Sequence, residues 1–283
     1  MRRRHPRNAP GNWFVDSACS NCTAARSVAP GLIVERDGQS VFARQPETPE
    51  EVTMAWRARL LCPTASVRTE TEVERPRSIF PEKMTENVYR LGYNSPHSAG
   101  AHSFAILRRG GNCMVDGPRW TKAVVNQFES WGGLSHILLT HRDDVGDAAR
   151  YAKHFASRVW IHDADRHAAP FATDMVEGLD VRVIGDDLSI IPVPGHSKGS
   201  VVYYFDGSAF FTGDSLAWDF EGGDLMVWED YAWYSIREQG RSMRRLLDYP
   251  FEWVFAGHGG SQHRPAPEMH ARLESLLARI AKP

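Results

Sequence analysis

Four short apolar stretches in the second half of the chain each run directly into a loop that contains a histidine or an aspartate. They read HILLTHRDD, IIPVPGHSKGS, AFFTGDS and EWVFAGHGG, and their ligand-type residues are His141, Asp143, His196, Asp214 and His258. Stretches of this length and composition are typical of buried strands. Imidazole and carboxylate groups on rigid strand ends suit zinc, iron or manganese, and flanking glycines let the backbone approach an ion closely. The pattern predicts a fold that gathers these strand ends around a metal site.

From about residue 85 the chain alternates between short strands and amphipathic helices. A helix is expected at 121–131, with the glycine pair 132–133 as its cap, and another at the C-terminal end. This succession predicts an α/β fold.

The order and spacing of the four loops resemble the metal-binding motifs of the metallo-β-lactamase superfamily. The matching segments are Thr140-His141, the PGHSKGS of 194–200, the GDS of 213–215 and the GHG of 257–259. The resemblance covers about residues 85–283. It implies an αββα sandwich, in which two mixed sheets pack face to face with helices outside and the metal site lies at one edge.

The first of these motifs departs from the family pattern. Asp143 stands where the family has its second histidine, and Val145 and Gly146 stand where it has the Asp-His pair of the second metal position. Neither Val nor Gly ligates through its side chain. The site could therefore bind one divalent ion, or two if Asp144 or Asp147 serves as a substitute ligand. A carboxylate in place of an imidazole shifts the preference from zinc toward iron or manganese. The redox-active diiron members of the superfamily also carry a carboxylate at this position.

The resemblance implies hydrolysis of an ester, thioester or amide by metal-activated water. In that interpretation His141, Asp143 and His196 hold the metal, and Asp214 bridges or orients the water. His258 completes the site or binds the oxyanion of the substrate, and Asp147 acts as a base from behind the metal ligands.

A small-molecule substrate needs a pocket. The resemblance implies that the aromatic-rich segment after the third loop lines this pocket. The expected lining residues are Lys198, Trp228, Tyr231 and Trp233. An apolar cavity with few polar groups is typical of small-molecule sites.

The first part of the chain resembles a single-cluster bacterial ferredoxin, which implies a small α+β domain over residues 12–68. Cys19-x2-Cys22 is followed by a hairpin, by a helix with a capping box at Thr48, and by Cys62-Pro63. Ala25 occupies the position of the third ligand.

Three thiolates, those of Cys19, Cys22 and Cys62, can hold a 3Fe-4S cluster. They can also hold a site-differentiated 4Fe-4S cluster with an exogenous ligand or Asp16. A domain that has lost its cluster and a zinc site of three cysteines and one histidine are the alternatives. Cys113, in an apolar strand, is expected to be a core residue.

Amino-acid composition and the positions of the prolines give the remaining expectations. Residues 1–11 form a basic arm expected to be disordered, and the polar, proline-punctuated segment 69–84 is expected to link the two domains. The 33 basic and 35 acidic residues give a formal net charge of −2, which disfavours nucleic acid or an anionic membrane as partner. No segment approaches the ~20 apolar residues of a membrane span. A reducing, cytoplasmic location fits.

Three functions are compatible with these observations. The first is a metal-dependent hydrolase of the metallo-β-lactamase superfamily with an altered metal site. The second is an iron-dependent redox enzyme that receives electrons from the N-terminal cluster, and it would require an electron-transfer partner. The third is a non-catalytic binding protein in which Ala25, Val145 and Gly146 mark decayed sites.

Overall fold

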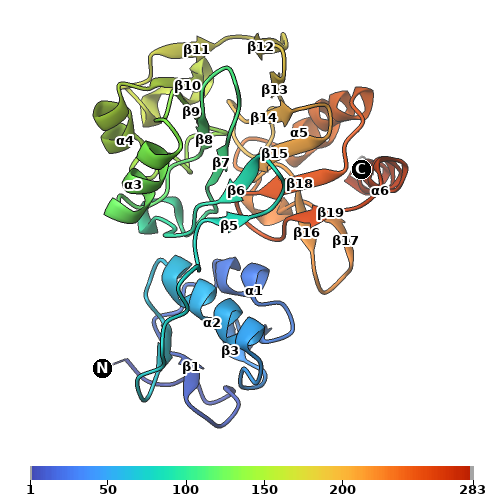
Figure 1. Ribbon diagram of the computed structural model, residues 1–283. Coiled ribbons are helices and arrows are strands. Elements are labelled where there is room, and N and C mark those ends of the chain that lie inside the picture. Colours follow the sequence, from blue (N-terminus) through green and yellow to red (C-terminus); the bar gives the residue numbers. More distant parts are fainter. Residues whose placement is uncertain (1, 281–283) are drawn as a thin grey trace.

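Two β-sheets packed face to face form the larger part of the computed structural model, which describes residues 2–280 (Figure 1). The first sheet has the strand order β11-β10-β9-β8-β7-β6-β5 and the second the order β12-β13-β14-β15-β18-β19. The strands of the first sheet are β5 (Glu82–Lys83), β6 (Val88–Arg90), β7 (Phe104–Ile106), β8 (Cys113–Val115), β9 (His136–Leu138), β10 (Arg158–His162) and β11 (Asp174–Val176). Those of the second are β12 (Arg182–Ile184), β13 (Leu188–Pro192), β14 (Val201–Phe205), β15 (Ala209–Gly213), β18 (Trp253–Ala256) and β19 (Gln262–His263).

Apolar side chains bind these layers together. Phe104, Phe211 and Phe255 meet between the two sheets with ring centroids 5.0–5.7 Å apart. Separate apolar clusters join each sheet to its outer helices, which are α3 (Lys122–Ser130) and α4 (Ala148–Phe155) on the first sheet and α5 (Ile236–Ser242) and α6 (Ala266–Ile280) on the second. A hairpin of β16 (Ala217–Asp219) and β17 (Asp224–Met226) follows β15. The predicted αββα sandwich is confirmed.

Strand direction determines where the polar loops meet. Strands β8, β9 and β10 are parallel, so their C-terminal ends share one edge of the first sheet. In the second sheet β15 and β18 are also parallel, and Gly213 pairs with Ala256 at their C-terminal ends. The loops that follow β9, β13, β15 and β18 consequently gather at one edge of the sandwich.

A smaller domain precedes the sandwich. It contains β1 (Trp13–Val15) paired with β4 (Val67–Thr69), α1 (Ala24–Val28), the hairpin of β2 (Ile33–Arg36) and β3 (Gln39–Phe42), and α2 (Pro49–Leu61). Helix α2 begins at the predicted capping box, because Thr48 Oγ1 accepts from Glu51 N and Glu51 accepts from the Thr48 backbone. Trp13, Phe42 and Trp56 form the aromatic centre of its core.

Both predicted irregular segments are more ordered than expected. The arm lies along β1, where His5 N donates to Val15 O and Arg4 donates to Glu70, so the described residues 2–11 are not a disordered extension. Within the segment 69–84, Ile79 is buried in the core of the small domain and β5 already pairs with β6 of the first sheet. None of the helices within residues 2–280 has both the length and the apolar character needed to cross a membrane.

A buried histidine joins the two domains. His102 Nε2 lies 2.6 Å from Ser27 Oγ of α1, and His102 Nδ1 lies 3.2 Å from Asn94 Nδ2. Because the Asn94 amide can only donate to Nδ1, we assign the proton of a neutral ring to Nε2, from which it is donated to Ser27. Burial, followed by the charge of Arg90, lowers the pKa of His102 well below its usual value.

Protonation of His102 should weaken this domain contact. A folded-state pKa below the unfolded value of about 6.5 contributes stability that is present above that pH and is lost as the pH falls toward the folded pKa. Between pH 7.5 and 5.5, the wild type should therefore lose more unfolding free energy than His102→Gln, by up to about 1.4 kcal/mol per pH unit in the affected range. Urea unfolding of both proteins at the two pH values measures this, and equal losses would contradict the assignment.

Candidate metal centre

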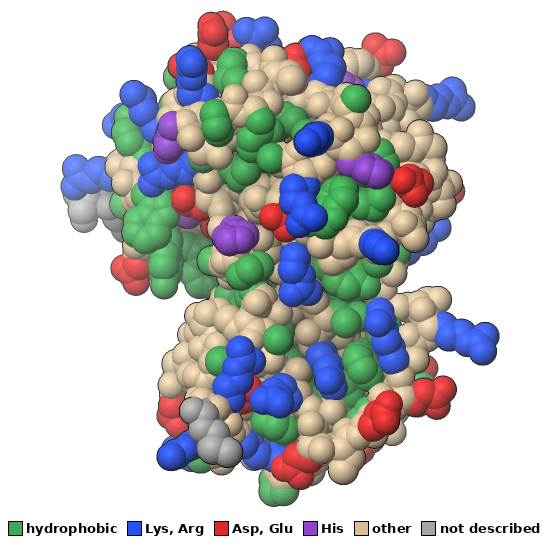
Figure 2. Space-filling view, turned by 90° about the vertical axis from the view of Figure 1, so that its left-hand side faces the viewer, with side chains coloured by type: hydrophobic (Ala, Val, Ile, Leu, Met, Phe, Trp, Pro, Cys, Tyr) green, Lys and Arg blue, Asp and Glu red, His purple; other side chains and the backbone are tan. Residues whose placement is uncertain are grey.

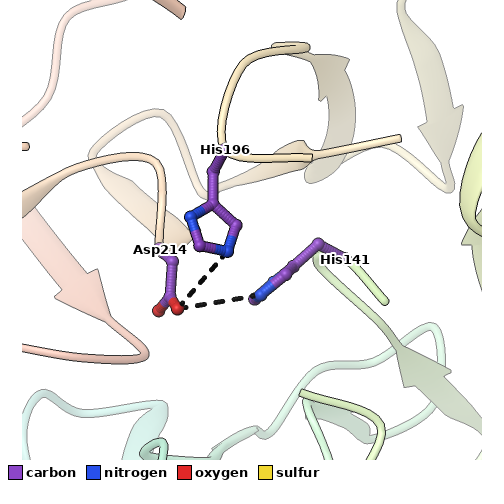
Figure 3. A group of neighbouring side chains, drawn as sticks. All are labelled: His141, His196 and Asp214. Carbon is purple, nitrogen blue, oxygen red and sulfur yellow. Dashed lines mark ion pairs between the residues drawn. The ribbon is translucent and has the colours of Figure 1, made fainter. Parts of the chain in front are cut away.

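The first group of converging side chains consists of His141, His196 and Asp214. They follow β9, β13 and β15, and one ligand atom from each lies within 4.8 Å of the others. Asp214 Oδ2 is 3.7 Å from His141 Nε2 and 3.7 Å from His196 Nε2. Figure 3 shows the three side chains pointing toward one another. The arrangement brings together three of the residues expected to bind metal.

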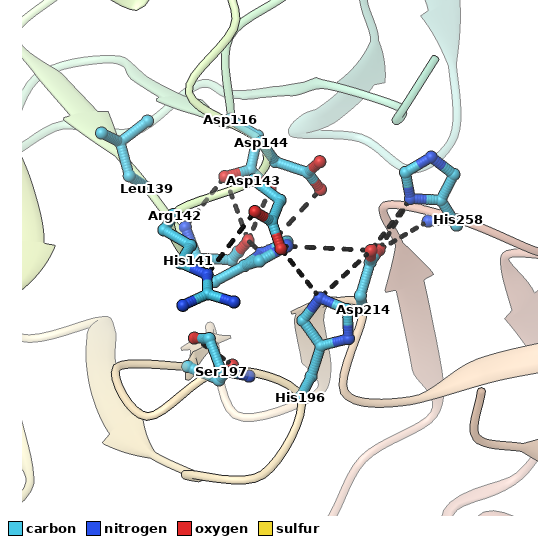
Figure 4. A network of polar contacts seen from close by, with 12 residues as sticks. Asp116, Leu139, His141, Arg142, Asp143, Asp144, His196, Ser197, Asp214 and His258 are labelled. Atoms are coloured by element: carbon cyan, nitrogen blue, oxygen red, sulfur yellow. Dashed lines mark hydrogen bonds and ion pairs between the residues drawn. The ribbon is translucent and has the colours of Figure 1, made fainter. Parts of the chain in front are cut away.

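A second group shares Asp214 with the first. It consists of Asp144, Asp214 and His258, again with one ligand atom from each within 4.8 Å. His258 Nδ1 lies 2.9 Å from Asp214 Oδ1, and the His258 backbone N–H donates to the same oxygen at 3.1 Å (Figure 4). A Cβ at Gly257 would lie 2.7 Å from Asp144 Oδ2 and 2.9 Å from Asp214 Oδ1, so the second group requires glycine there.

Several polar atoms of these groups are buried without a hydrogen-bond partner. Among the described residues this holds for His141 Nε2, both ring nitrogens of His196 and both carboxylate oxygens of Asp144. Buried polar atoms almost always have partners in folded proteins. A divalent cation would satisfy imidazole nitrogens and carboxylate oxygens at once, and mixed ligands of this kind suit zinc, iron or manganese. The residues present therefore fit a metal ion.

The charges at the site favour a cation as well. Burial and the negative charge of Asp214 raise the pKa of Asp144 well above its usual range. Burial also opposes ionisation of Asp214, but His258, His141 and His196 outweigh it and hold the Asp214 pKa below its usual value. Burial lowers the pKa of His141 to about 4, so this imidazole is neutral and able to ligate.

His141 is oriented by a hydrogen-bonded chain behind it. Thr140 Oγ1 lies 2.9 Å from Asp116 Oδ2 and 3.0 Å from His141 Nδ1, and the Thr140 backbone N–H also donates to Asp116. We assign the hydroxyl proton to the bond with Asp116, so that Thr140 accepts from His141 Nδ1–H and leaves Nε2 free to face Asp214. Such partners fix the tautomer and orientation of metal-binding histidines.

Asp165 joins the first two ligand loops. This buried carboxylate, in the 3₁₀ helix Asp163–Ala168, accepts from the Arg142 backbone N–H at 3.0 Å and from the Gly199 backbone N–H at 3.2 Å. It also accepts from the Ser197 hydroxyl. Asp116 and Asp165 were not identified from the sequence, because neither lies in a metal-binding motif and only the folded chain brings them to the site.

The structure places the three aspartates of the first loop differently. Asp143 is half exposed at the rim, with Oδ2 3.4 Å from His196 Nε2 and 3.8 Å from His141 Nε2. Asp144 belongs to the second group. Asp147 instead accepts from the Trp120 backbone N–H at 2.7 Å and lies outside the cavity lining, which corrects its expected role as the base.

Backbone packing explains why position 146 is not the histidine that the family has at its second metal position. Gly146 has a φ of +50°, and a Cβ there would lie 1.9 Å from Gly117 O. No side chain fits at this close crossing of two backbone segments. Asp144, two residues earlier, supplies the only carboxylate of this loop that reaches Asp214 and His258 among the described residues.

A cavity of about 1060 Å³ opens onto both groups. The expected aromatic residues Trp228, Tyr231 and Trp233 line it, and the Trp233 ring lies 6.4 Å from that of His196. Lys198 is exposed and is not among the lining residues, contrary to expectation. The opposite wall comes from the small domain and includes Asn21, Cys22, Thr23, Arg26, Pro63 and Thr64.

The three expected cluster ligands lie in or against the core of the small domain, but their sulfur atoms do not converge within 4.8 Å as the ligand atoms of the two His/Asp groups do. Cys19 Sγ accepts from the Asn21 backbone N–H at 3.4 Å, and Cys62 Sγ accepts from the Ser66 backbone N–H at 3.2 Å. Burial and the neighbouring Cys62 and Cys19 raise the pKa of Cys22. Hydrogen bonds to sulfur are one of the ways in which proteins tune iron–sulfur clusters.

Contacts describe three further residues of the sequence analysis. Asp16 is buried, and its carboxylate accepts from the Ala18 backbone N–H at 2.9 Å and pairs with Arg68 at 3.4 Å, so it already has partners within the protein. Ala25 is buried in the core of the small domain. Cys113 lies in β8, where burial raises its pKa to about 11, as expected of a core residue.

Comparison with known proteins finds relatives for both parts of the chain. A family model described as the 4Fe-4S single cluster domain of ferredoxin I matches residues 15–69. A hydroxyacylglutathione hydrolase of Cereibacter sphaeroides is 36% identical over 183 residues, covering 60% of this chain and 67% of that protein. One of Rhodospirillum rubrum is 31% identical over 180 residues, covering 61% of this chain and 68% of that protein.

Other curated relatives share less of their length with this chain. It spans 59% of a second Cereibacter sphaeroides hydroxyacylglutathione hydrolase and 44% of one from Fuscovulum blasticum. Among solved structures, the BLEG-1 B3 metallo-β-lactamase has a TM-score of 0.51 at 20% identity, covering 62% of this chain and 93% of that one. The VMB-1 structure has a TM-score of 0.55 at 16% identity, and the match covers 71% of this chain and 97% of that one. Both share the fold.

Removing the Asp165 carboxylate should loosen the two ligand loops that it joins. In Asp165→Ala three donors lose their acceptor, and we expect a loss of at least about 2 kcal/mol of unfolding free energy together with less bound metal. Urea unfolding and elemental analysis measure the two effects. Asp163→Ala, an exposed position on the same 3₁₀ helix, is the matched control and should stay within about 0.5 kcal/mol of the wild type. Normal metal content and stability in Asp165→Ala would contradict the role given to this residue.

Proposed function

This chain belongs to the metallo-β-lactamase superfamily, and from that premise we propose that it is a metal-dependent hydrolase that cleaves thioesters. The observation that carries the proposal is the convergence of buried, unpartnered ligand atoms from His141 and His196 on Asp214, beside a cavity that His196 and Asp214 line. The relatives named hydroxyacylglutathione hydrolase favour a thioester over an ester or amide.

Four residues would hold the metal ion. His141, His196 and Asp214 form its buried side, and Asp143 approaches the two imidazoles from the exposed side. A divalent ion in this place lowers the pKa of bound water to about 7 and polarises a substrate carbonyl. A second ion between Asp144, Asp214 and His258 is compatible with the same ligands.

The remaining groups handle protons and position the substrate. Asp144, which lines the cavity with both oxygens unpartnered, takes the proton of the attacking water at a carboxylate oxygen. His258 is held by Asp214, which raises the His258 pKa against the effect of burial, and its ring faces the cavity as a hydrogen-bond partner for the substrate oxygen.

Metal removal and a pair of aspartate variants test this assignment. Protein depleted by a chelator should lose thioester hydrolysis, and addition of zinc, iron or manganese should restore it. Asp144→Asn should lower kcat by at least about 100-fold, because general base catalysis contributes about 10²–10⁴-fold. The measurement is the rate of thiol release from a simple acyl thioester.

Asp147→Asn is the matched control, since it removes a neighbouring carboxylate that lies outside the cavity. Its kcat should remain within a few-fold of the wild type. Full activity in the chelated protein would contradict metal-dependent hydrolysis, and equal effects of the two variants would contradict the role of Asp144.

One observation favours a redox function as a second candidate. Cys22 lies close to the segment that contacts the metal centre: its sulfur packs beside Gly100, where a Cβ would lie 3.0 Å away, and the adjacent Ala99 O lies 3.4 Å from His258 Nε2. His258 in turn contacts Asp214. The residues of one proposed cofactor site are thus connected to those of the other through two backbone residues. The unpartnered ligand atoms argue against the third candidate, a binding protein with a decayed site.

Anaerobic purification of the wild type and Cys62→Ser separates these candidates. The wild type should show the broad visible absorbance of an iron–sulfur cluster with matching sulfide, and Cys62→Ser should lose both, because Cys62 supplies one of only three thiolates. For a hydrolase, zinc-loaded Cys62→Ser keeps thioester hydrolysis. Cys113→Ser, in the buried strand β8, is the control for loss of a cysteine elsewhere. Hydrolysis that required both iron and the cluster would support the redox function instead.

A further inference from the structure

A second cavity continues the metal-site cavity between the two domains. It has a volume of about 620 Å³ and shares Asn21, Thr23, Arg26 and Trp228 with the first. It contains none of the metal-centre residues and reaches Phe220 on the sandwich and Val34 on the small domain. The two cavities form one groove that leads from the metal centre along the domain boundary. Figure 2 shows this boundary as a waist between two lobes.

Arg26 stands at the junction of the two cavities. Its Nη1 donates to Asn21 Oδ1 at 2.5 Å and to Ser40 Oγ at 2.8 Å, and no aspartate or glutamate within residues 2–280 forms an ion pair with it. Both partners are neutral and bind one nitrogen only. The guanidinium is therefore held in place while its charge stays without a counter-ion in the groove.

Arg26 is fixed relative to the metal centre from both sides. Three residues before it, Thr23 Oγ1 accepts from the backbone N–H of Gly259 at 3.0 Å, next to His258. One residue after it, Ser27 Oγ contacts His102 at 2.6 Å. The short helix that carries Arg26 is thus bonded to the sandwich at both ends.

The other charges in the groove limit where an anion can bind. The outer cavity is lined by Glu35, Asp219 and Glu221, which repel an anion beyond the junction. Near the metal, Arg142 already lies 3.6 Å from Asp143. Arg26 is consequently the position in the groove at which an anionic group gains most.

Accordingly, we propose that Arg26 of the small domain binds an anionic group, a carboxylate or a phosphate, on the arm of the substrate that extends away from the metal centre. Guanidinium groups bind both anions through paired N–H donors. The small domain then determines specificity for the hydrolase, whatever redox role its cysteines have. This inference rests on the proposed thioester hydrolysis for its kinetic test and on the groove alone for its binding test.

The kinetic test compares thioesters that differ only in one terminal group: carboxylate, phosphate or neutral carboxamide, placed on the acyl or the thiol arm. The wild type should prefer an anionic compound. Arg26→Gln keeps hydrogen-bond donors but removes the charge, and should raise KM for that compound about 10- to 100-fold, the range for one charge-assisted hydrogen bond. The kcat and the KM for the carboxamide should change less than about twofold. Arg26→Lys should restore part of the preference.

Controls separate binding from folding. Arg77 is exposed and lines neither cavity, and Arg77→Gln changes the net charge by the same amount as Arg26→Gln. This control should behave as the wild type. Iron and sulfide content should be equal in Arg26→Gln and the wild type. A wild type that hydrolyses charged and neutral thioesters equally well, or an Arg26→Gln that loses both equally, overturns the inference.

A binding measurement makes the result independent of turnover. Calorimetry with the corresponding non-hydrolysable thioethers should give a Kd for the anionic compound that rises about 10- to 100-fold in Arg26→Gln. If no thioester is hydrolysed, the proposed function fails, and the calorimetric ratio still decides the inference: a Kd that does not respond to the charge of either partner overturns it.

Discussion

The arrangement of the site depends on one shared carboxylate. Asp214 follows β15, and because β15 and β18 are parallel neighbours, Asp214 and His258 leave the second sheet side by side. The same carboxylate faces His141 of the first sheet and His196 of the loop after β13. Asp214 therefore joins two groups of ligands from both sheets, and it holds His258 directly by hydrogen bonds to the ring and the backbone.

The small domain forms part of the site. The loop that carries Cys22 walls the cavity opposite the aromatic residues, and Thr23 and Ser27 bond it to the sandwich. Order in the cysteine loop and access to the metal centre are thereby linked. The proposed anion site at Arg26 follows from the same contact, because the domain boundary is also the wall of the groove.

The sequence was sufficient for what depends on local pattern. The apolar stretches before His141, His196, Asp214 and His258 are strands, and the capping box at Thr48 begins a helix. Contacts between residues far apart in the sequence could not be predicted from such patterns. Position 146 admits no side chain because its backbone crosses Gly117 too closely, and only the folded chain shows that Asp144 rather than Asp147 reaches the site. Asp165 accepts from residues more than twenty positions away, and Arg26 borders the groove only because the two domains pack together, which no local motif reveals.

Element-specific anomalous diffraction from crystals grown without oxygen tests the central claim most directly. We expect a metal peak bounded by His141, His196 and Asp214, with Asp143 on its exposed side, and an iron peak of cluster size among Cys19, Cys22 and Cys62. A second, smaller peak between Asp144, Asp214 and His258 would fit the same account. Crystals of protein purified in the presence of these metals that show no peak at Asp214 would contradict it.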